Sequence, residues 1–410
     1  MPARSVFVTG IGIVSPAGST AEATWNNLLA GNRYIRRLDW PWPADPAGGA
    51  YFGATAPGHT ATSDPEVSND VRRADMLAWA VAQAVEQAEL ATRAGTVRIG
   101  VCEGTSKIML DLNSVLGNSL EKTPNTFSPL LSGLIPHDSF TSFLDFIRPL
   151  WVYRAVAACA SGSVCIARGF QAIRDGDADA VICMASDASI APLWMAAYER
   201  MGVLGSPTSP HENDACRPFD AARNGFAVGE GAAAVILEAG DTMKPSQNAG
   251  PLAELLGAVI GCDPSGLTQV DEQGESLTEA IRRATRQAGI NPQAIQAIQA
   301  HGTATASNDM AEMNAFRAIF AGEMSRIPAL SIKGAIGHLL GAAGAVELAV
   351  CAMAIRDQRL PGNINLKHPD PGFGGVNLPV EATQLKRGPI LKTSLGFGGH
   401  LAALILGPAD

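Results

Sequence analysis

The chain has 410 residues, of which 47% are hydrophobic and 17% are charged. Such a composition supports a large buried core and excludes wholesale disorder, and the length allows two or three domain-sized units or one large α/β domain. The 39 acidic residues exceed the 30 basic residues, so the formal net charge is −9. This charge argues against broad nucleic-acid binding, whereas an acidic protein partner would need a local basic patch.

Neither the cysteines nor the apolar segments indicate a metal site, a disulfide framework or a membrane span. The seven cysteines are scattered and form no C-x-x-C pair, and no H-E-x-x-H motif is present. The first residues lead directly into an apolar run without the regions of a signal peptide. The least polar long stretch, residues 334–355, contains a histidine, a glutamate and several glycines, which favours a buried segment. We therefore expect a cytoplasmic protein without a membrane span.

The first quarter of the chain predicts two strands, two helices and a long loop. An apolar strand over residues 6–10 precedes a helix over 21–30. Residues 36–70 are rich in proline, glycine, alanine and aspartate, which indicates a surface loop. A helix over 71–90, with its apolar residues on one side, and a strand over 97–101 follow.

The middle of the chain predicts a strand–helix–strand unit around Cys159. A strand over residues 155–158 meets this cysteine, a helical run covers 164–173, and an apolar strand covers 179–184. Such a unit favours a parallel sheet that is covered on both faces. A further buried strand is predicted over 231–238.

A polar stretch with glycine and proline, residues 239–251, is the predicted boundary between two halves. We expect an N-terminal half over 1–240, which carries the cysteine, and a C-terminal half over 250–410, which carries two candidate histidines. The second half repeats the order of elements but not the residues of the first. Its predicted strands, helices and closing hairpin cover residues 297–300, 309–320, 329–332, 342–355 and 391–406.

Cys159 is the first candidate for chemistry because it lies where a strand meets a helix. Its small neighbours Ala158, Ala160 and Gly162 let the chain turn tightly and leave room for a substrate. A thiol at a helix N-terminus lies at the positive end of the helix dipole, which favours the nucleophilic thiolate. The alternative is a small buried core thiol.

Two histidines and a lysine are the candidates in the second half. His301 directly follows a predicted strand, where active-site groups of open α/β sheets tend to lie, although a loop histidine bonded to the backbone is the alternative. Lys333 and His338 lie in an apolar, glycine-rich stretch where a charge is costly unless it is paired or functional. Taken alone, His338 is more often a satisfied core histidine. Thr303 and Thr305 offer hydroxyls that could hold an amide-rich ligand or cap the next helix.

A glycine-rich turn around Phe397 could expose backbone N–H groups to an oxyanion, with an ordinary hairpin turn as the competing interpretation. No phosphate-binding loop of the form G-x-x-x-x-G-K-[ST] is present. Residues 9–12 are only a fragment of a dinucleotide fingerprint, so the sequence gives little support for a nicotinamide cofactor.

Taken together, these clusters resemble the β-ketoacyl-acyl-carrier-protein synthases of the elongating, Cys-His-His type, in the thiolase-like superfamily. The resemblance covers nearly the whole chain, and its strength lies in the joint presence of the motifs in this order. The motifs lie at residues 8–12, 15–16, 158–162, 217–220, 225–226, 229–231, 300–303, 308–309, 312, 333, 337–338, 341–344 and 396–399. The resemblance implies an α/β, thiolase-like five-layered αβαβα sandwich of two similar halves, usually a homodimer.

The resemblance also implies a decarboxylative Claisen condensation. Cys159 would take an acyl chain, as a thioester, from the phosphopantetheine arm of an acyl carrier protein, and no cofactor would be bound to the chain itself. His301 and His338 would donate hydrogen bonds to the malonyl thioester carbonyl, where negative charge builds as carbon dioxide leaves. Lys333 would orient the histidines and pair with Glu312.

Substrate-binding roles are implied for four further residues. Thr303 and Thr305 match threonines that contact pantetheine. Phe397 matches a gating aromatic, and its backbone N–H would hold an oxyanion together with that of Cys159. Tyr198 falls near a position that lines the acyl pocket. Residues 104–107 depart from the pattern, since they bring a lysine and a hydroxyl where small or apolar residues are common.

Carrier proteins are acidic, and Arg72 and Arg73 match a basic docking position, with Arg200 as a further candidate. The alternative is that all three are ordinary surface charges.

The two histidines separate the chain from initiating synthases, and the lack of a cysteine near the C-terminus separates it from thiolases. Two other functions stay open: a related partner subunit that sets chain length in a heterodimer, and a non-catalytic acyl-binding scaffold. Fatty-acid and polyketide-type biosynthesis are both compatible with the sequence.

Overall fold

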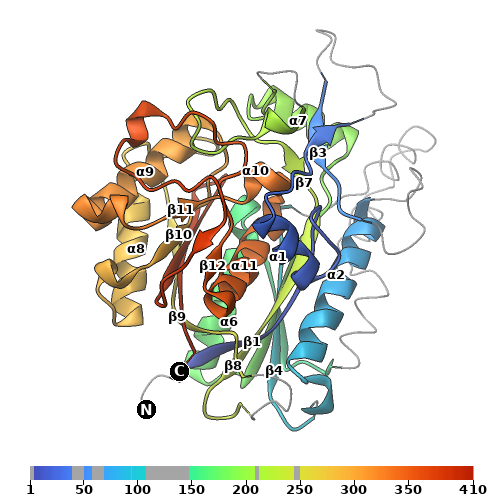
Figure 1. Cartoon of the computed structure of the whole chain (residues 1–410). Coiled ribbons are helices and arrows are strands. Elements are labelled where there is room, and N and C mark those ends of the chain that lie inside the picture. Colours follow the sequence, from blue (N-terminus) through green and yellow to red (C-terminus); the bar gives the residue numbers. More distant parts are fainter. Residues whose placement is uncertain are drawn as a thin grey trace, which may run out of the picture.

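The computed structural model describes residues 4–38, 50–57, 69–93, 95–107, 147–207, 212–243 and 250–409. Its central feature is a ten-stranded sheet with the strand order β11-β10-β14-β15-β9-β1-β8-β6-β4-β5 (Figure 1). The first five of its strands in the chain are β1 (Val6–Val14), β4 (Ile99–Thr105), β5 (Trp151–Val156), β6 (Ala180–Asp187) and β8 (Gly231–Ala239). The other five are β9 (Ala253–Cys262), β10 (Ala297–Gln299), β11 (Ala329–Leu330), β14 (Ile390–Gly396) and β15 (His400–Gly407).

The sheet consists of two halves with the same topology. When the strands of each half are numbered in chain order, β5-β4-β6-β8-β1 and β11-β10-β14-β15-β9 both follow the order 3-2-4-5-1. In each half the first two neighbouring pairs are parallel and the next two are antiparallel. Only Phe7↔Glu254 and Val8↔Ala253 pair across the junction of β1 and β9, so the strands of the two halves pair over one short stretch. The predicted two similar halves are confirmed.

Helices cover both faces of each half and complete the predicted five layers (Figure 1). The helix α2 (Asn69–Gln87) packs on the outer face of β1, β6 and β8. Between the halves lie α6 (Ser161–Asp175) and α11 (Ala343–Asp357), which contact strands of both. On the far outer face α8 (Glu275–Ala288) packs on β9 and β15, and α9 (Ala306–Phe320) packs on α8.

The remaining elements are short. They are α1 (Ala21–Leu29), α7 (Pro192–Arg200), α10 (Lys333–Ile336), the 3₁₀ turns η2 (Ala158–Ala160) and η6 (Leu340–Ala342), the small sheet β2 (Arg36–Arg37), β3 (Phe52–Ala54) and β7 (Val228–Gly229), and the pair β12 (Arg359–Leu360) and β13 (Thr383–Gln384). Within the described part of the chain, no helix combines the length and the hydropathy that a membrane crossing requires.

The packing of α2 explains the glycines of the dinucleotide-like fragment. A Cβ atom at Gly12 would lie 1.8 Å from the Ala80 backbone oxygen, and one at Gly10 would lie 2.2 Å from the Ala84 backbone oxygen. The glycines on β1 therefore allow close approach of a helix, since any side chain there would clash.

The prediction of a surface loop over residues 36–70 is wrong in part. The strands β2 and β3 lie in this stretch, pair with each other, and extend to β7. Two-residue and three-residue strands carry too little periodicity to be read from sequence. Residues 39–49 and 58–68 of the predicted loop lie outside the described residues.

Candidate active site

The carboxyl ends of the six parallel strands bring the candidate residues to one edge of the two halves. Cys159 follows β5, Lys107 follows β4, and Asp187 ends β6. In the other half, His301 follows β10, Lys333 follows β11, and Phe397 follows β14. Side chains at the carboxyl ends of parallel strands share one edge of a sheet, which is where ligands bind in open α/β folds.

A strained backbone turn presents Cys159. The preceding residue, Ala158, has φ +47°, in a region that residues other than glycine seldom occupy. The Ser161 hydroxyl stabilises the turn, because it accepts the Ala157 N–H at 2.9 Å and lies 2.8 Å from the Thr105 carbonyl oxygen. A Cβ atom at residue 396 would lie 2.7 Å from the Ala157 backbone oxygen and 3.2 Å from the Cys159 nitrogen, so only glycine permits this approach of β14.

The expected thiolate is not what the environment of Cys159 favours. The side chain is buried, and this desolvation raises the pKa of the Cys159 thiol to about 12. Lys333 and Lys107 oppose the increase in pKa, whereas Asp187 adds to it. The helix-dipole expectation is therefore wrong, because burial outweighs the nearby positive charges.

His301 and His338 lie next to each other in the interior. Their rings are 5.2 Å apart between centroids, in an edge-to-face arrangement. The Phe226 ring lies 5.1 Å from the His338 ring, and Phe226 belongs to the same cluster of buried side chains as Cys159. Residues that are far apart in the sequence, from both halves, thus surround a common region.

The hydrogen bonds of both rings define their tautomers. The Lys333 ammonium lies 3.4 Å from Nδ1 of His301, and because an ammonium can only donate, Nδ1 accepts and Nε2 carries the hydrogen. In the same way the Leu340 backbone N–H donates to Nδ1 of His338 at 3.3 Å. Among the described residues, Nε2 of the fully buried His338 has no hydrogen-bond partner. Buried donors without partners are rare and call for an acceptor from outside the chain.

Both imidazoles are neutral at neutral pH. Burial lowers the pKa of His301 and His338 well below the usual value, and the positive charges of Lys333 and Lys392 add to this effect. The site therefore offers neutral N–H donors.

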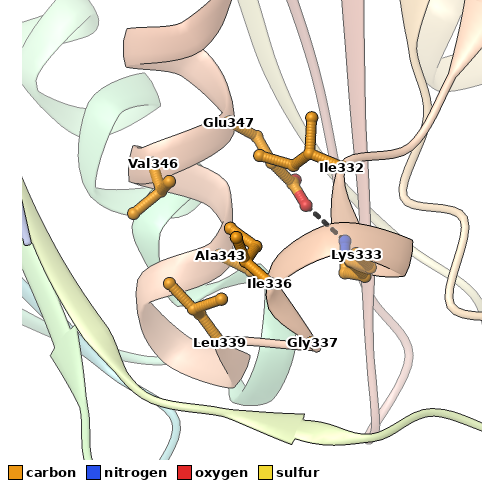
Figure 2. Close-up of a pocket in the computed structure, with 8 residues that line it drawn as sticks. All are labelled: Ile332, Lys333, Ile336, Gly337, Leu339, Ala343, Val346 and Glu347. Carbon is orange, nitrogen blue, oxygen red and sulfur yellow. Dashed lines mark hydrogen bonds and ion pairs between the residues drawn. The ribbon is translucent and has the colours of Figure 1, made fainter. Parts of the chain in front are cut away.

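Lys333 does not pair with Glu312, as the sequence predicts, but with Glu347. Its Nζ contacts Oε1 of Glu347 on α11 (Figure 2). The same Nζ also donates to the His301 carbonyl oxygen. The other carboxylate oxygen of Glu347 lies 2.9 Å from Nζ of Lys392, which is fully buried on β14. Burial lowers the pKa of Lys392, and Glu347 opposes that decrease. One carboxylate thus serves two buried lysines.

Glu312 instead stabilises the turn after β10. Its two carboxylate oxygens accept the backbone N–H groups of His301 and Gly302, each at 2.7 Å, and one of them also accepts the Thr393 hydroxyl at 2.7 Å. Its structural support therefore acts through the backbone of the histidine and not through the lysine.

A small space beside the ion pair has a volume of about 150 Å³ (Figure 2). Its lining residues are Ile332, Lys333, Ile336, Gly337, Leu339, Ala343, Val346 and Glu347. Pockets that hold small molecules measure about 300–1,000 Å³, so this space is a packing gap around the ion pair and no acyl pocket.

The predicted substrate-binding residues lie around the cysteine and the histidines. The hydroxyls of Thr303 and Thr305 are 2.9 Å apart. Thr305 precedes the first residue of α9 but its side chain makes no capping hydrogen bond, so the alternative of a helix cap is wrong for this side chain. Phe397 is half-buried at the hairpin turn, and Tyr198 lies in the buried cluster that contains Cys159.

Two of the three docking candidates point into the protein. Arg72 pairs with the fully buried Glu230, and Arg73 lies 3.4 Å from the buried Glu103 and 3.1 Å from the Ser186 hydroxyl. Each of these arginines thus has a carboxylate partner on the neighbouring strands while its side chain stays partly exposed, and its role in docking stays a prediction. Arg200 is exposed in the last turn of α7.

Comparison with known proteins identifies the family. The family profile "Beta-ketoacyl synthase, N-terminal domain" matches residues 3–242, and "Beta-ketoacyl synthase, C-terminal domain" matches residues 252–367. The 3-oxoacyl-[acyl-carrier-protein] synthase 2 of Coxiella burnetii is 30% identical, with 99% of both chains covered. The protein of the same name from Synechocystis is 31% identical, with 98% of this chain and 97% of the relative covered.

Solved structures give the same result. One is a type II polyketide ketosynthase bound to a hexaketide, in complex with its acyl-carrier protein (TM-score 0.89, 26% identity, 99% of this chain and 100% of that chain covered). Another is the ishigamide ketosynthase/chain length factor (TM-score 0.85, 27% identity, both chains fully covered). The chain belongs to the β-ketoacyl synthase family.

Proposed function

We propose that the protein condenses an acyl group held on Cys159 with malonyl-acyl-carrier protein and releases carbon dioxide, in fatty-acid or polyketide-type biosynthesis. The observation that carries this proposal is the buried pair of neutral imidazoles, in which Nε2–H of His338 has no partner among the described residues. A neutral N–H donor in a dry site stabilises an oxyanion that forms during reaction, and it does so without prior reorganisation.

The first step transfers the acyl group to the cysteine. The Cys159 sulfur attacks the thioester carbonyl carbon, the bond to the pantetheine sulfur breaks, and the thiol hydrogen leaves with the pantetheine as its new thiol. Since burial raises the pKa of Cys159 to about 12, the proton has to move as the carbon–sulfur bond forms.

The second step generates the nucleophile by decarboxylation. The bond between the malonyl carboxylate and its α-carbon breaks, carbon dioxide leaves, and the electron pair moves onto the thioester oxygen as an enolate. His301 and His338 donate Nε2–H to this oxygen. Lys333 fixes the tautomer of His301 through Nδ1 and, with Glu347, holds the ring in place.

The third step joins the two groups. The enolate carbon attacks the Cys159 thioester, and the backbone N–H groups of Cys159 and Phe397 hold the resulting oxyanion. The close approach of Gly396 to the Cys159 nitrogen supports this placement. Collapse of the intermediate breaks the carbon–sulfur bond and expels the cysteine thiolate, which takes a proton from solvent to become the thiol again, and a β-ketoacyl thioester remains on the carrier protein.

The proposal includes an acyl carrier protein, whose phosphopantetheine delivers both substrates past Thr303 and Thr305, and a second copy or a related subunit. The edge strand β5, next to the cysteine, exposes Val152, Tyr153 and Val156, and an exposed apolar edge favours pairing with another chain. Seven cysteines without disulfide bonds, one of them catalytic, suit the reducing cytoplasm.

Mass spectrometry of the intact protein after incubation with acyl-carrier protein tests the first step. We expect an acyl adduct on Cys159 that is absent in Cys159→Ala. An absent adduct with every acyl donor would refute the proposal in favour of an acyl-binding scaffold or a partner subunit.

Release of carbon dioxide from malonyl-carrier protein tests the role of the histidine. His338→Ala should keep acylation but release carbon dioxide about 10²–10³-fold more slowly, the usual loss for one oxyanion donor. Normal decarboxylation by this variant would show that His338 has another role.

A further inference from the structure

A lysine with several hydroxyl neighbours lies beside the candidate nucleophile, and no step of the condensation uses it. The Nζ atom of Lys107 lies 2.8 Å from Oγ of Ser106, 2.5 Å from Oγ of Ser189 and 3.1 Å from the Tyr198 hydroxyl. A carboxylate oxygen of Asp187 lies 3.6 Å away, and the Trp194 ring centroid 4.7 Å away. We call these residues, Ser106, Lys107, Asp187, Ser189 and Tyr198, the lysine–hydroxyl cluster.

The lysine–hydroxyl cluster is built into the strand ends that support Cys159. Ser106 follows β4, whose Thr105 carbonyl oxygen contacts the Ser161 hydroxyl in the turn of the cysteine. Asp187 accepts the Gly341 backbone N–H at 3.2 Å, three residues after His338. Tyr198 shares a buried cluster with Cys159 and Leu340. An acyl chain that grows from the cysteine sulfur into these buried side chains therefore approaches Tyr198 and Lys107.

The hydrogen-bond directions point to the Tyr198 hydroxyl as the donor for a substrate. Ser106 and Ser189 each donate their hydroxyl hydrogen to Asp187, and both accept from Lys107. The Tyr198 hydroxyl oxygen also accepts from Lys107, and its own hydrogen lies beside Ser189, whose Oγ already accepts from Lys107, so a substrate oxygen would compete with Ser189 for it. Since an ammonium polarises the hydroxyl, this O–H is a strengthened donor.

The composition of the lysine–hydroxyl cluster is unfavourable for an alkyl chain. The Lys107 side chain is 15% exposed and Asp187 is fully buried, so a methylene chain would displace water from charged and polar groups without replacing their hydrogen bonds. An oxygen atom on the chain would accept from the Tyr198 hydroxyl, which Lys107 polarises, and offset this cost. Sites built to hydrogen-bond a substrate discriminate strongly against analogues that lack the polar group.

We propose that the lysine–hydroxyl cluster selects an acyl chain that carries a hydrogen-bond-accepting oxygen, such as a keto, hydroxyl or carboxylate group, over a saturated alkyl chain. This inference rests on the proposed function, since it names the substrate class of the same site. Lys107 and Tyr198 are specificity-determining residues in it, and Asp187 neutralises the ammonium.

The test compares six-carbon pantetheine thioesters that differ only in oxygen: hexanoyl, 3-oxohexanoyl, 3-hydroxyhexanoyl and adipoyl. The rate of the acyl adduct on Cys159 is measured by mass spectrometry for the full-length chain and for Lys107→Met, Lys107→Arg and Tyr198→Phe. Lys386→Met, an exposed lysine on the surface, is the matched control. The four thioesters differ in intrinsic reactivity, but that difference is the same for every variant. The informative quantity is therefore how the rate of each oxygenated thioester relative to hexanoyl changes from one variant to another.

For at least one oxygenated donor, we expect the ratio of its acylation rate to that of hexanoyl to fall about ten- to a hundredfold in Lys107→Met. This is the effect of one charge-assisted hydrogen bond. Lys107→Arg should keep most of the ratio, Tyr198→Phe should lower it, and Lys386→Met should leave it unchanged. A preference limited to adipoyl would identify a carboxylate, and one limited to the 3-oxo or 3-hydroxy donors would identify an oxygen close to the thioester.

Equal ratios in the wild-type chain, Lys107→Met and Tyr198→Phe would overturn the inference and leave Lys107 as a tether between β4 and α7. The proposed function would survive that result, because the adduct would still form. If Lys107→Met does not fold, Tyr198→Phe tests the inference, since it removes only a single hydroxyl. No adduct from any thioester would refute the proposed function itself and this inference with it.

Discussion

The cysteine region and the histidine region respond to burial in opposite ways. Desolvation raises the pKa of the Cys159 thiol, whereas it lowers the pKa of both His301 and His338. The physical cause is the same, because a dry environment disfavours whichever form carries charge. The thiol therefore keeps its proton and the imidazoles stay without an extra one. The thiol and both imidazoles are therefore neutral at physiological pH.

The charged groups behind the two regions also differ. Behind the histidines, Glu347 contacts two fully buried lysines directly. Near the cysteine, Lys107 is surrounded by hydroxyls, and its carboxylate partner Asp187 is 3.6 Å away. The first arrangement fixes positions rigidly, whereas in the second the lysine polarises hydroxyls that can exchange hydrogen bonds with another molecule. This difference suggests a structural role for the first group and a substrate-contacting role for the second.

Removal of the carboxylate at Glu347 should give the largest effect. Glu347→Gln leaves Lys333 and Lys392 as buried ammonium groups without a counter-charge, and breaking a buried pair costs about 3–5 kcal/mol of unfolding free energy. Denaturant unfolding monitored by circular dichroism measures this loss.

Two variants sharpen the Glu347 experiment. Glu22→Gln removes the carboxylate of an exposed pair with Arg356 and should cost about 0–1 kcal/mol. The double variant Glu347→Gln/Lys392→Met should recover part of the stability, because it removes one of the two uncompensated charges. A loss below 1 kcal/mol for Glu347→Gln alone would contradict the shared-carboxylate arrangement.

Much of this architecture can be predicted from sequence, because local signals mark it. The turn at Cys159 lies between an apolar strand and a helix rich in small residues, and the structure confirms both elements with shifted ends. His301, Lys333 and Phe397 each follow a short strand, as expected. Period and small residues are visible in the chain itself and predict these elements, whereas the thiolase-like fold class and the residue roles come from the resemblance of the motifs to a known family.

The sequence does not show which carboxylate pairs with each buried lysine or arginine. Glu347 lies inside an apolar helix, so nothing local tells whether Lys333 pairs with it or with Glu312. Lys392 was missed for the same reason, as its neighbours on β14 are apolar or small. For Glu347 and Lys392, the only indication in the sequence of a functional or paired group is a charged residue within a buried segment. Arg72 similarly lies on an amphipathic helix, and only tertiary packing brings it to the buried Glu230.

The pH dependence of cysteine alkylation tests the opposite pKa shifts of the Cys159 thiol and the two imidazoles. Because the pKa of Cys159 is raised to about 12, its thiolate fraction should grow about tenfold per pH unit, so alkylation by iodoacetamide should accelerate about a hundredfold from pH 7 to pH 9. The histidines add no step in this range, since their pKa values are lowered and both rings are already neutral. Peptide mass mapping follows the label on Cys159, and Cys159→Ala shows the background. A rate that levels off below pH 8 would show instead that the helix N-terminus stabilises the thiolate.

The smallest effect is expected at the surface, where Arg200 is the exposed docking candidate. Arg200→Glu should raise KM for malonyl-carrier protein less than about tenfold, with the difference shrinking at high salt, because rim charges act mainly on the association rate. KM for the free pantetheine thioester should not change, since that substrate needs no docking surface. Arg283→Glu, on the exposed side of α8 in the other half, is the matched charge reversal. If Arg283→Glu raises KM for the carrier-bound substrate as much as Arg200→Glu does, the effect comes from net charge and docking does not depend on Arg200.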